Sequence, residues 1–419
     1  MKSLPLEGLR VIDLSRFWAG PFGTQLLGSM GAEVIRIESA TYIDMVRYII
    51  PPAGEEGGRP YERGAYFHMA NRNKCSIALD LQHPRGKELC LRLIEVGDVL
   101  IENFSARVMG NLGLDYDTLR KTRPDLIVVS MPGFGQTGPY RDYVCFGEAL
   151  EAMCGLSYLT GYADGPPTRS SGAFTDPVAG LYADYAILAA LQRRNRTGEG
   201  CYVDLSHQEA FVTLLGDMVM DFTMNGRGRT RMGNRHPTRA PQGVYPCKGE
   251  DQWVAISVAS DEEWKALCRA MGRPELAQDP GYQHTLGRMR KQEELDALIG
   301  EWTARLDHYR VMELLQGVGV AGGAVLASDE LFQDPHFKAR GFFEEADHPE
   351  VGRYSYFGIP VKFSRTPGGT HTPAPLFGQH NRYVFGEVLG LSDPEIDGLL
   401  RSGVIADQPG EGLAEDHVV

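Results

Sequence analysis

The chain has 419 residues, of which 42% are hydrophobic, and single hydrophobic cores stop growing at roughly 250 to 300 residues. Two domains are therefore expected. The formal net charge of −13 argues against nucleic acid and anionic membrane surfaces as partners, because like charges repel. A small anionic ligand is still compatible with this charge, since a few basic residues in one pocket suffice to hold it.

Cysteine and histidine spacing limits the chemistry further. The seven cysteines are scattered singly, without a Cys-x-x-Cys pair, which argues against a disulfide framework or structural zinc and favours a reducing compartment. The histidines show no ligand spacing, so no metal is predicted. Met1–Glu7 lacks the apolar stretch of a signal peptide, and no later segment has about 20 continuous apolar residues. We therefore expect a cytoplasmic protein.

Short β-branched runs alternate with amphipathic stretches over roughly the first 130 residues, as they do in β-α-β units. The expected strands are 9–14, 33–38, 76–81, 98–102 and 126–130, and helices are expected over 22–30 and 86–96. This order predicts the α/β class with an open parallel sheet. Helices over 150–159 and 178–193 should follow, then one more strand at 200–205.

A change in composition marks a boundary around Asn225–Pro241, which is rich in Gly, Arg, Pro and Asn and has almost no apolar periodicity. The strand 253–258 and the helices that follow it indicate a smaller α+β domain. A strand-like stretch at 354–363 and short closing helices complete the chain. We expect a large α/β domain over 1–224, a small domain over 225–330, and a C-terminal segment, 331–419, that returns to the large domain.

Gly133–Gly138 fits the pattern G-x-G-x-x-G after a strand, which suggests dinucleotide binding. That fingerprint should open a helix at the first β-α turn, whereas this one occurs late and is followed by Pro139. The first turn itself, Ser15–Pro21, carries no glycine triad. A flexible or ligand-facing turn is the preferred interpretation.

Asp176 precedes Pro177 at the start of a long apolar helix, a common arrangement for a helix N-cap. The same position suits a nucleophile, because the helix dipole would hold the carboxylate ionised at neutral pH. The pattern alone leaves both interpretations open.

Five arginines stand close together between Asn225 and Pro241 in an otherwise acidic chain: Arg227, Arg229, Arg231, Arg235 and Arg239. They form either a solvated loop or a clamp for a phosphate or carboxylate, which guanidinium groups bind in a bidentate manner.

Several segments carry a family resemblance through their order and spacing. They are 6–14, 19–21, 31–38, 73–74, 76–81, 102–104, 164–168, 176 ahead of 189–191, 334–336, 340–341, 360–364 and 374–380. Together they resemble the class III CoA-transferases, the family that includes formyl-CoA transferase and carnitine CoA-transferase. The resemblance spans nearly the whole chain.

The resemblance implies an α/β large domain that binds coenzyme A, with a smaller inserted domain, in an interlocked homodimer. It places the nucleophile at Asp176, which would form an acyl anhydride and then an aspartyl-CoA thioester. The substrates implied are an acyl-CoA donor, with succinyl-CoA suggested, and a free carboxylic acid, for which a larger or aromatic acid is suggested.

The resemblance also implies residues that bind coenzyme A. They are Arg16, Phe17 and Ala19 at the first β-α turn, Lys74, Asn103 and Phe104 near the nucleotide, and Asn111 and Leu112 close by. Lys74 would meet a phosphate and Phe104 would cover the adenine. Asn111 stands where some members have an arginine.

Two departures from the family bear on the reaction. The loop from Arg235 to Gly243 replaces the glycine run of formyl-CoA transferase, which argues against formate or oxalate chemistry. The alternative activity is that of the related α-methylacyl-CoA racemases, which have a histidine in a Gly-His-Asp segment where this chain has Cys145–Glu148. Because racemisation needs an acid and a base, the absence of the histidine favours transfer.

Glu148 and Glu151 either shape the site or complement a helix dipole. A third hypothesis is that the chain is a non-catalytic subunit that pairs with an active homologue.

Overall fold

The computed structural model describes residues 4–50, 58–170 and 172–410. It divides into two compact units. The large unit comprises Met1–Leu156, Arg169–Arg227 and Lys338–Val419, and the small unit comprises Ser157–Thr168 and Gly228–Phe337. The sequence predicted domain boundaries at 225 and 331. It did not predict that the short segment 157–168 groups with the small unit.

Six parallel strands form one sheet in the described part of the large unit, in the order β3-β2-β1-β4-β5-β6. Their bounds are β1 Arg10–Asp13, β2 Glu33–Glu38, β3 Lys74–Ala78, β4 Val99–Glu102, β5 Ile127–Ser130 and β6 Cys201–Asp204. The register pairs Ile12 with Ile35 on one side and with Leu100 on the other. This confirms the predicted α/β class and its parallel sheet.

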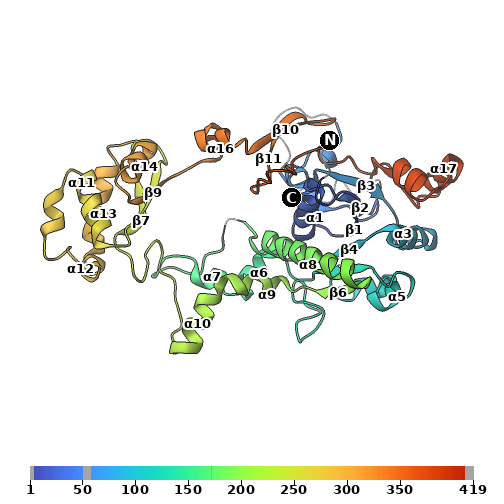
Figure 1. The fold of residues 1–419 in the computed structure, drawn as a ribbon, viewed down its shortest axis with the longest axis horizontal. Helices are drawn as coiled ribbons and strands as arrows, with labels where there is room; N and C mark the ends of the chain where they lie inside the picture. Colours follow the sequence, from blue (N-terminus) through green and yellow to red (C-terminus); the bar gives the residue numbers. More distant parts are fainter. Residues whose placement is uncertain (1–3, 51–57, 171, 411–419) are drawn as a thin grey trace. The chain divides into compact units, whose positions relative to one another are not determined.

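The two faces of the sheet are covered by different helices (Figure 1). Successive strand residues alternate between these faces. Val11 packs on the side of α1 (Ala19–Ser29) and α8 (Thr175–Thr197), whereas Ile12 packs on the side of α3 (Pro84–Val96) and α17 (Asp393–Arg401). Burial on both faces explains why the strands read as continuous apolar runs.

Helices α1 and α8 cross with their backbones in close contact. A Cβ atom on Gly180 would lie 2.5 Å from the carbonyl oxygen of Ala19, and one on Gly23 would lie 2.8 Å from the carbonyl oxygen of Gly180. Asp176 lies one turn before Gly180, on the same face of α8. The crossing therefore sets the position of Asp176 relative to the turn after β1.

The chain returns to the large unit after the small one. A π-helical turn at Tyr383–Val388 and α17 contribute Val384, Phe385, Ile396 and Leu399 to the same core as Ile12. A two-stranded antiparallel ribbon of β10 (Phe343–His348) and β11 (Gly352–Phe357) precedes them. The predicted strand at 354–363 ends at Phe357, before Pro360, which cannot donate to a strand ladder.

Other helices of the large unit lie around the sheet. They are α2 Ala65–Asn71, α4 Val108–Leu112, α5 Tyr116–Thr122, α6 Gly147–Met153, α9 His207–Val212 and α10 Gly216–Asn225. The single helix predicted over 150–159 is two, because Gly155 adopts a φ of +95° between α6 and α7 (Leu156–Leu159). The helix therefore breaks at a conformation that only glycine adopts easily.

The small unit has an antiparallel sheet in the order β7-β8-β9. Its core includes Val254, Trp264, Leu295 and Leu315. The elements are β7 Gln242–Pro246, β8 Trp253–Ser257, β9 Ala321–Val325, α11 Asp261–Ala270, α12 Thr285–Arg290, α13 Gln292–Thr303, α14 His308–Gln316 and α15 Ser328–Gln333, and α16 (Pro335–Arg340) follows at the boundary.

The helix crossing generates a testable prediction. Gly180→Ala should destabilise the protein by roughly 1–3 kcal/mol, because its methyl group would overlap a backbone oxygen that cannot turn away. Gly216→Ala is the control, since a Cβ there meets nothing within 4 Å. Urea unfolding of both variants measures the difference, and equal stability of the two would contradict the proposed contact.

Candidate active site

The strand order creates a crevice between β1 and β4. From β1 the sheet continues to β2 and β3, and from β4 it continues in the opposite direction to β5 and β6. Ligands of open α/β sheets bind at such a switch point, beyond the carboxyl ends of the strands. Here the backbone N–H of Arg16 donates to Oδ1 of Asn103 at 2.8 Å, and Nδ2 of Asn103 donates to the carbonyl of Arg16 at 2.8 Å. Two of the predicted residues thus tie the two strand ends together.

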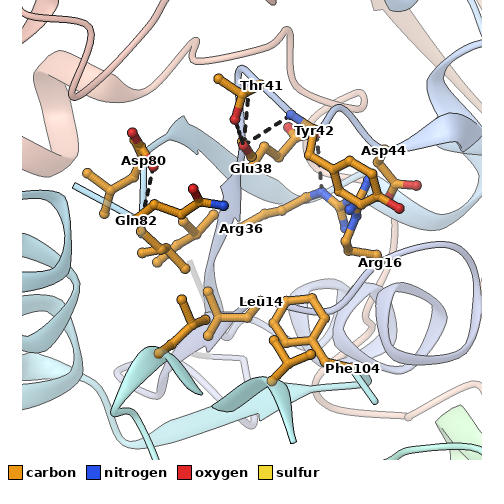
Figure 2. Close-up of a pocket in the computed structure, with 16 residues that line it drawn as sticks. Leu14, Arg16, Arg36, Glu38, Thr41, Tyr42, Asp44, Asp80, Gln82 and Phe104 are labelled. Atoms are coloured by element: carbon orange, nitrogen blue, oxygen red, sulfur yellow. Dashed lines mark hydrogen bonds and ion pairs between the residues drawn. The ribbon is translucent and has the colours of Figure 1, made fainter. Parts of the chain in front are cut away.

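An outer cavity of about 310 Å³ opens at this edge of the sheet (Figure 2). Leu14 and Phe104 form one wall, and Asp80 and Gln82 lie across the cavity from Arg16 and Tyr42. The guanidinium carbon of Arg16 lies 4.1 Å from the centre of the Tyr42 ring. The outer cavity therefore combines an apolar surface with a cation, the two features that a nucleotide needs.

Buried ion pairs form the back of the outer cavity. Arg36 lies 2.5 Å from Asp44, and Arg47 lies 2.7 Å from Glu38. Burial alone would raise the pKa of Glu38, but Arg47 and then Arg36 lower it to about 2. Because Arg36 and Arg47 are paired with carboxylates, they give this wall a fixed shape. Arg16 is the arginine that stands at the opening of the outer cavity.

An inner cavity of about 290 Å³ adjoins the outer one, since Arg16, Tyr42, Phe104 and Val108 line both. Asp176 lies in this inner cavity. The predicted residues that line the inner cavity are Arg16, Phe17, Ala19, Asn103, Phe104 and Asp176, and Leu112 lines the outer cavity. The two cavities therefore bring together seven of the nine residues that the sequence suggested.

Phe17 occupies a strained conformation at the cavity wall. Its φ is +61°, which bulky residues rarely adopt. Its N–H donates to Asp44 at 3.1 Å, and its ring lies edge-on to Phe146 at 5.2 Å. Those two contacts hold the turn between β1 and α1 in place.

Asp176 does not cap its helix. Helix α8 begins at Thr175, its N-cap is Phe174, and no side chain makes a capping hydrogen bond there. The N-cap interpretation of Asp176 is therefore wrong. The side chain of Asp176 is only 16% exposed.

The electrostatics of Asp176 also differ from expectation. Burial, together with Glu148 and Glu151, raises the pKa of Asp176 to about 7. The expected effect of the helix dipole, which would keep the carboxylate ionised, is outweighed by the loss of hydration. The carboxyl group therefore exchanges its proton near neutral pH.

Glu151 holds the segment that leads into α8. Its buried carboxylate accepts hydrogen bonds from the hydroxyl of Ser170 at 2.5 Å and from the backbone N–H of Phe174 at 3.0 Å. Glu148 is more exposed and lies 3.5 Å from Arg169. Glu151 therefore stabilises the start of α8, and Asp176 is not needed for that purpose.

Two predicted residues lie outside both cavities. The buried ammonium of Lys74 donates to Asp13 at 3.1 Å, to the carbonyl of Pro21 at 2.9 Å and to Asn71 at 3.0 Å. These bonds use all three of its protons, so the structure gives it no path to a phosphate. Asn111 is exposed and lines neither cavity.

The glycine motif and the arginine-rich segment have separate roles. No helix begins at Gly133–Gly138, and the N–H of Gln136 donates to Asp204 at 2.8 Å, so this segment is a turn tied to the end of β6. Arg227 contacts Asp221, Arg231 contacts the carbonyls of Tyr158 and Gly165, Arg235 contacts Glu293, and Arg239 donates to the hydroxyl of Ser257 at 3.4 Å. Arg239 lines a groove of about 690 Å³ in the small unit.

Tyr42 and His207 line the inner cavity and were not anticipated, nor was Tyr66, which lines neither cavity but interacts electrostatically with Asp176. Nδ1 of His207 lies 3.9 Å from Oδ1 of Asp176 in the inner cavity. His207 follows β6, and the rule that ligands meet the carboxyl ends of parallel strands would have marked it. Burial and the charge of Asp176 raise the pKa of Tyr66. No spacing in the sequence distinguishes the two tyrosines.

The described residues contain neither a cluster of metal ligands nor a membrane-spanning helix. Within 4–50, 58–170 and 172–410, no group of three or more His, Cys, Asp or Glu side chains is placed to hold a metal ion. In the same residues, no helix has the length and apolar character needed to cross a membrane.

Comparison with known proteins identifies relatives over nearly the whole chain. A model of CoA-transferase family III matches residues 6–381. The chain is 37% identical over 402 residues to succinyl-CoA–D-citramalate CoA-transferase of Chloroflexus aurantiacus, covering 96% of this chain and 98% of that protein. It is 34% identical over 384 residues to succinate–glutarate CoA-transferase of Agrobacterium fabrum, covering 92% and 96%. A crystal structure of a CAIB/BAIF family protein from Brucella suis matches with a TM-score of 0.84 at 34% identity, covering 92% of this chain and all of that one.

The raised pKa of Asp176 predicts a pH-dependent gain in stability for Asp176→Asn. The folded pKa of about 7 exceeds the ordinary value of 3.8, so ionisation opposes folding as the pH rises between these values. We expect the variant to be more stable than the wild type by roughly 2–4 kcal/mol at pH 8. The difference should shrink as the pH falls toward 4. Denaturant unfolding from pH 5 to 8.5 measures it, and a constant difference across that range would contradict the burial argument.

Proposed function

The chain belongs to CoA-transferase family III, and from that premise we propose that it transfers coenzyme A from succinyl-CoA to a carboxylic acid, with Asp176 as the nucleophile. One observation carries the proposal. The buried carboxyl of Asp176 lies in an inner cavity that adjoins an outer cavity suited to a nucleotide.

The lining of the cavities supports one orientation of the donor. The adenine would pack on Phe104 and Leu112 in the outer cavity, and Arg16 would meet a phosphate at the junction. The pantetheine arm would then pass Val108 into the inner cavity and bring the thioester to Asp176. The predicted phosphate contact of Lys74 is left out of this proposal, because its protons are bonded to other groups.

The proposed reaction passes through two covalent intermediates on Asp176. The carboxylate of Asp176 attacks the thioester carbonyl, and the C–S bond breaks to give an acyl anhydride and a CoA thiolate. The thiolate attacks the aspartyl carbonyl, which releases the donor acid and leaves aspartyl-CoA. The acceptor carboxylate then repeats these steps in reverse. Water would hydrolyse both intermediates, and the burial of Asp176 limits the access of water to them.

The names of the relatives support a choice of substrates. One acts on succinyl-CoA and D-citramalate and the other on succinate and glutarate, all of them derived from acids with two carboxyl groups. We propose a dicarboxylic acid as acceptor in place of the larger or aromatic acid that the sequence suggested. Rates with glutarate, citramalate and benzoate as acceptors test this choice.

We also propose that the chain forms the homodimer that its family resemblance implies. The large unit exposes apolar side chains on α8 and α10, namely Leu181, Tyr185, Leu188, Phe222 and Met224, which a second copy would cover. Light scattering of the purified protein tests this, and a monomer would contradict it.

The racemase alternative is not supported by the site. An acid and a base that meet opposite faces of one carbon atom must stand roughly 5–6 Å apart, twice the hydrogen-bond reach. His207 and Asp176 are separated by 3.9 Å, which leaves no room for a carbon between them.

Trapping the covalent intermediate tests the nucleophile. The enzyme is incubated with succinyl-CoA and then with hydroxylamine, and mass spectrometry should find a hydroxamate on Asp176. Asp176→Asn has nearly the same shape, and its transfer rate should fall by on the order of 10³-fold or more. A variant with full activity would end the proposed mechanism.

The pH dependence of transfer gives a second test. Because Asp176 must be ionised to attack, kcat/KM should rise with pH toward a plateau above about pH 7. Glu148→Gln removes the larger of the two carboxylate effects, so the rise should move to lower pH with the plateau unchanged. Glu151→Ala should also move the rise to lower pH, by a smaller amount, and in addition it should lower the plateau, since it releases the segment before α8. Identical profiles for the two variants would contradict these separate roles.

A further inference from the structure

One of the two arginines that line the inner cavity has an unpaired guanidinium group. Arg141 is exposed and lies in the loop before α6. Its backbone N–H donates to the carbonyl of Gly138 at 3.3 Å, but its guanidinium makes no ion pair or hydrogen bond with the residues that the structure describes. Burial raises the pKa of Tyr202, against a smaller opposing effect of Arg141, so this phenol is neutral near pH 7. The positive charge of Arg141 is therefore available to a ligand.

Aromatic contacts hold the loop that carries Arg141. The rings of Tyr140 and Tyr143 lie 4.8 Å apart, and they pack edge-on against Phe134 at 5.9 and 6.1 Å. Phe134 itself is buried, and the backbone N–H of Tyr143 donates to the carbonyl of Tyr140 at 2.9 Å. The loop is therefore a folded turn that keeps Arg141 at the cavity wall.

The rest of the described cavity wall offers no free positive charge. Phe17 and Phe146 contribute apolar rings to it. His207 is uncharged near pH 7, because burial lowers its pKa to about 4. The second arginine, Arg16, donates to a backbone carbonyl at 2.5 Å and lines the outer cavity as well, where the proposed orientation of the donor gives it a phosphate. Arg141 is thus the cation that is left for the acyl group.

A dicarboxylic acyl group brings a second negative charge into this cavity. When the thioester of succinyl-CoA lies at Asp176, the free carboxylate of the succinyl group is three carbon–carbon bonds away, within the same cavity of about 290 Å³. Taking a carboxylate out of water among apolar rings is unfavourable unless a cation pairs with it. A guanidinium group pairs with a carboxylate through two parallel hydrogen bonds. The free arginine and the free carboxylate are therefore complementary.

We propose, on the basis of the proposed function, that Arg141 binds the free carboxylate of a dicarboxylic acyl group and so selects dicarboxylic over monocarboxylic substrates. Donor and acceptor both react at Asp176, so the same arginine serves each of them in turn. A monocarboxylic acyl group of equal length would enter the same cavity but would leave the guanidinium without a partner. Arg141 acts on the choice of substrate, and the chemistry at Asp176 is the same for both classes.

The test measures the selectivity between two donors that differ in one charge. Succinyl-CoA and butyryl-CoA have equally long acyl chains, and kcat/KM is measured for each with glutarate as the common acceptor, so that an effect on acceptor binding cancels in their ratio. The wild type should favour succinyl-CoA, and Arg141→Met should lower the ratio by about tenfold or more. Arg141→Lys keeps a charge but loses the planar fork, so its ratio should lie between these two. Arg120→Met is the control and should keep the ratio of the wild type, since Arg120 is exposed and pairs with Asp117 at 2.9 Å.

The outcomes separate selection by charge from a structural role. If Arg141→Met slows both donors equally, the ratio is unchanged and the inference is overturned. A wild type without preference for succinyl-CoA, or an equal fall of the ratio in Arg120→Met, overturns it as well. Circular dichroism establishes that the variants are folded, and the hydroxylamine trap is run on the wild type with succinyl-CoA. If Asp176 is not labelled, the proposed function fails together with this inference. If Asp176 is labelled while Arg141→Met keeps the ratio of the wild type, only the inference about Arg141 fails.

Discussion

The backbone contact between α1 and α8 at Gly23 and Gly180 is the constraint on which the site depends. It lets the two helices approach closely over the face of the sheet that carries Val11 and Val129. Asp176 is thereby held at the carboxyl ends of the strands, where the crevice between β1 and β4 opens. Larger side chains at the crossing would separate the helices and move the carboxyl group away from the turn at Phe17.

Burial then determines the chemistry of that carboxyl group. A helix start is favourable for a negative charge by only about 0.3–1 kcal/mol, whereas removal from water shifts a carboxyl pKa by several units. The result for Asp176 is a pKa of about 7. The enclosure that protects an activated ester from water therefore also keeps a proton on the nucleophile.

The sequence predicts the large-unit fold well because each central strand is buried on both faces and reads as a short apolar run. The boundaries of 10–13, 99–102 and 127–130 fall within one residue of expectation at each end. The sequence could not reveal where individual polar side chains point. Lys74 looks like a surface charge until the fold places Asp13, 61 residues away, against it. His207 could be found only through the sheet, because it and Asp176 come from different strand-to-helix connections.

The C-terminal part of the large unit closes the core that begins at the other end of the chain. Ile405 bridges to Leu79, and Val384 and Phe385 pack with Ile12 and Leu100 on the face opposite Asp176. During synthesis, the part of that face that α3 does not cover stays exposed until some 385 to 405 residues have left the ribosome. A chaperone would therefore have a long interval in which to bind the nascent sheet. A nascent chain on a stalled ribosome would expose an apolar surface that is prone to aggregation.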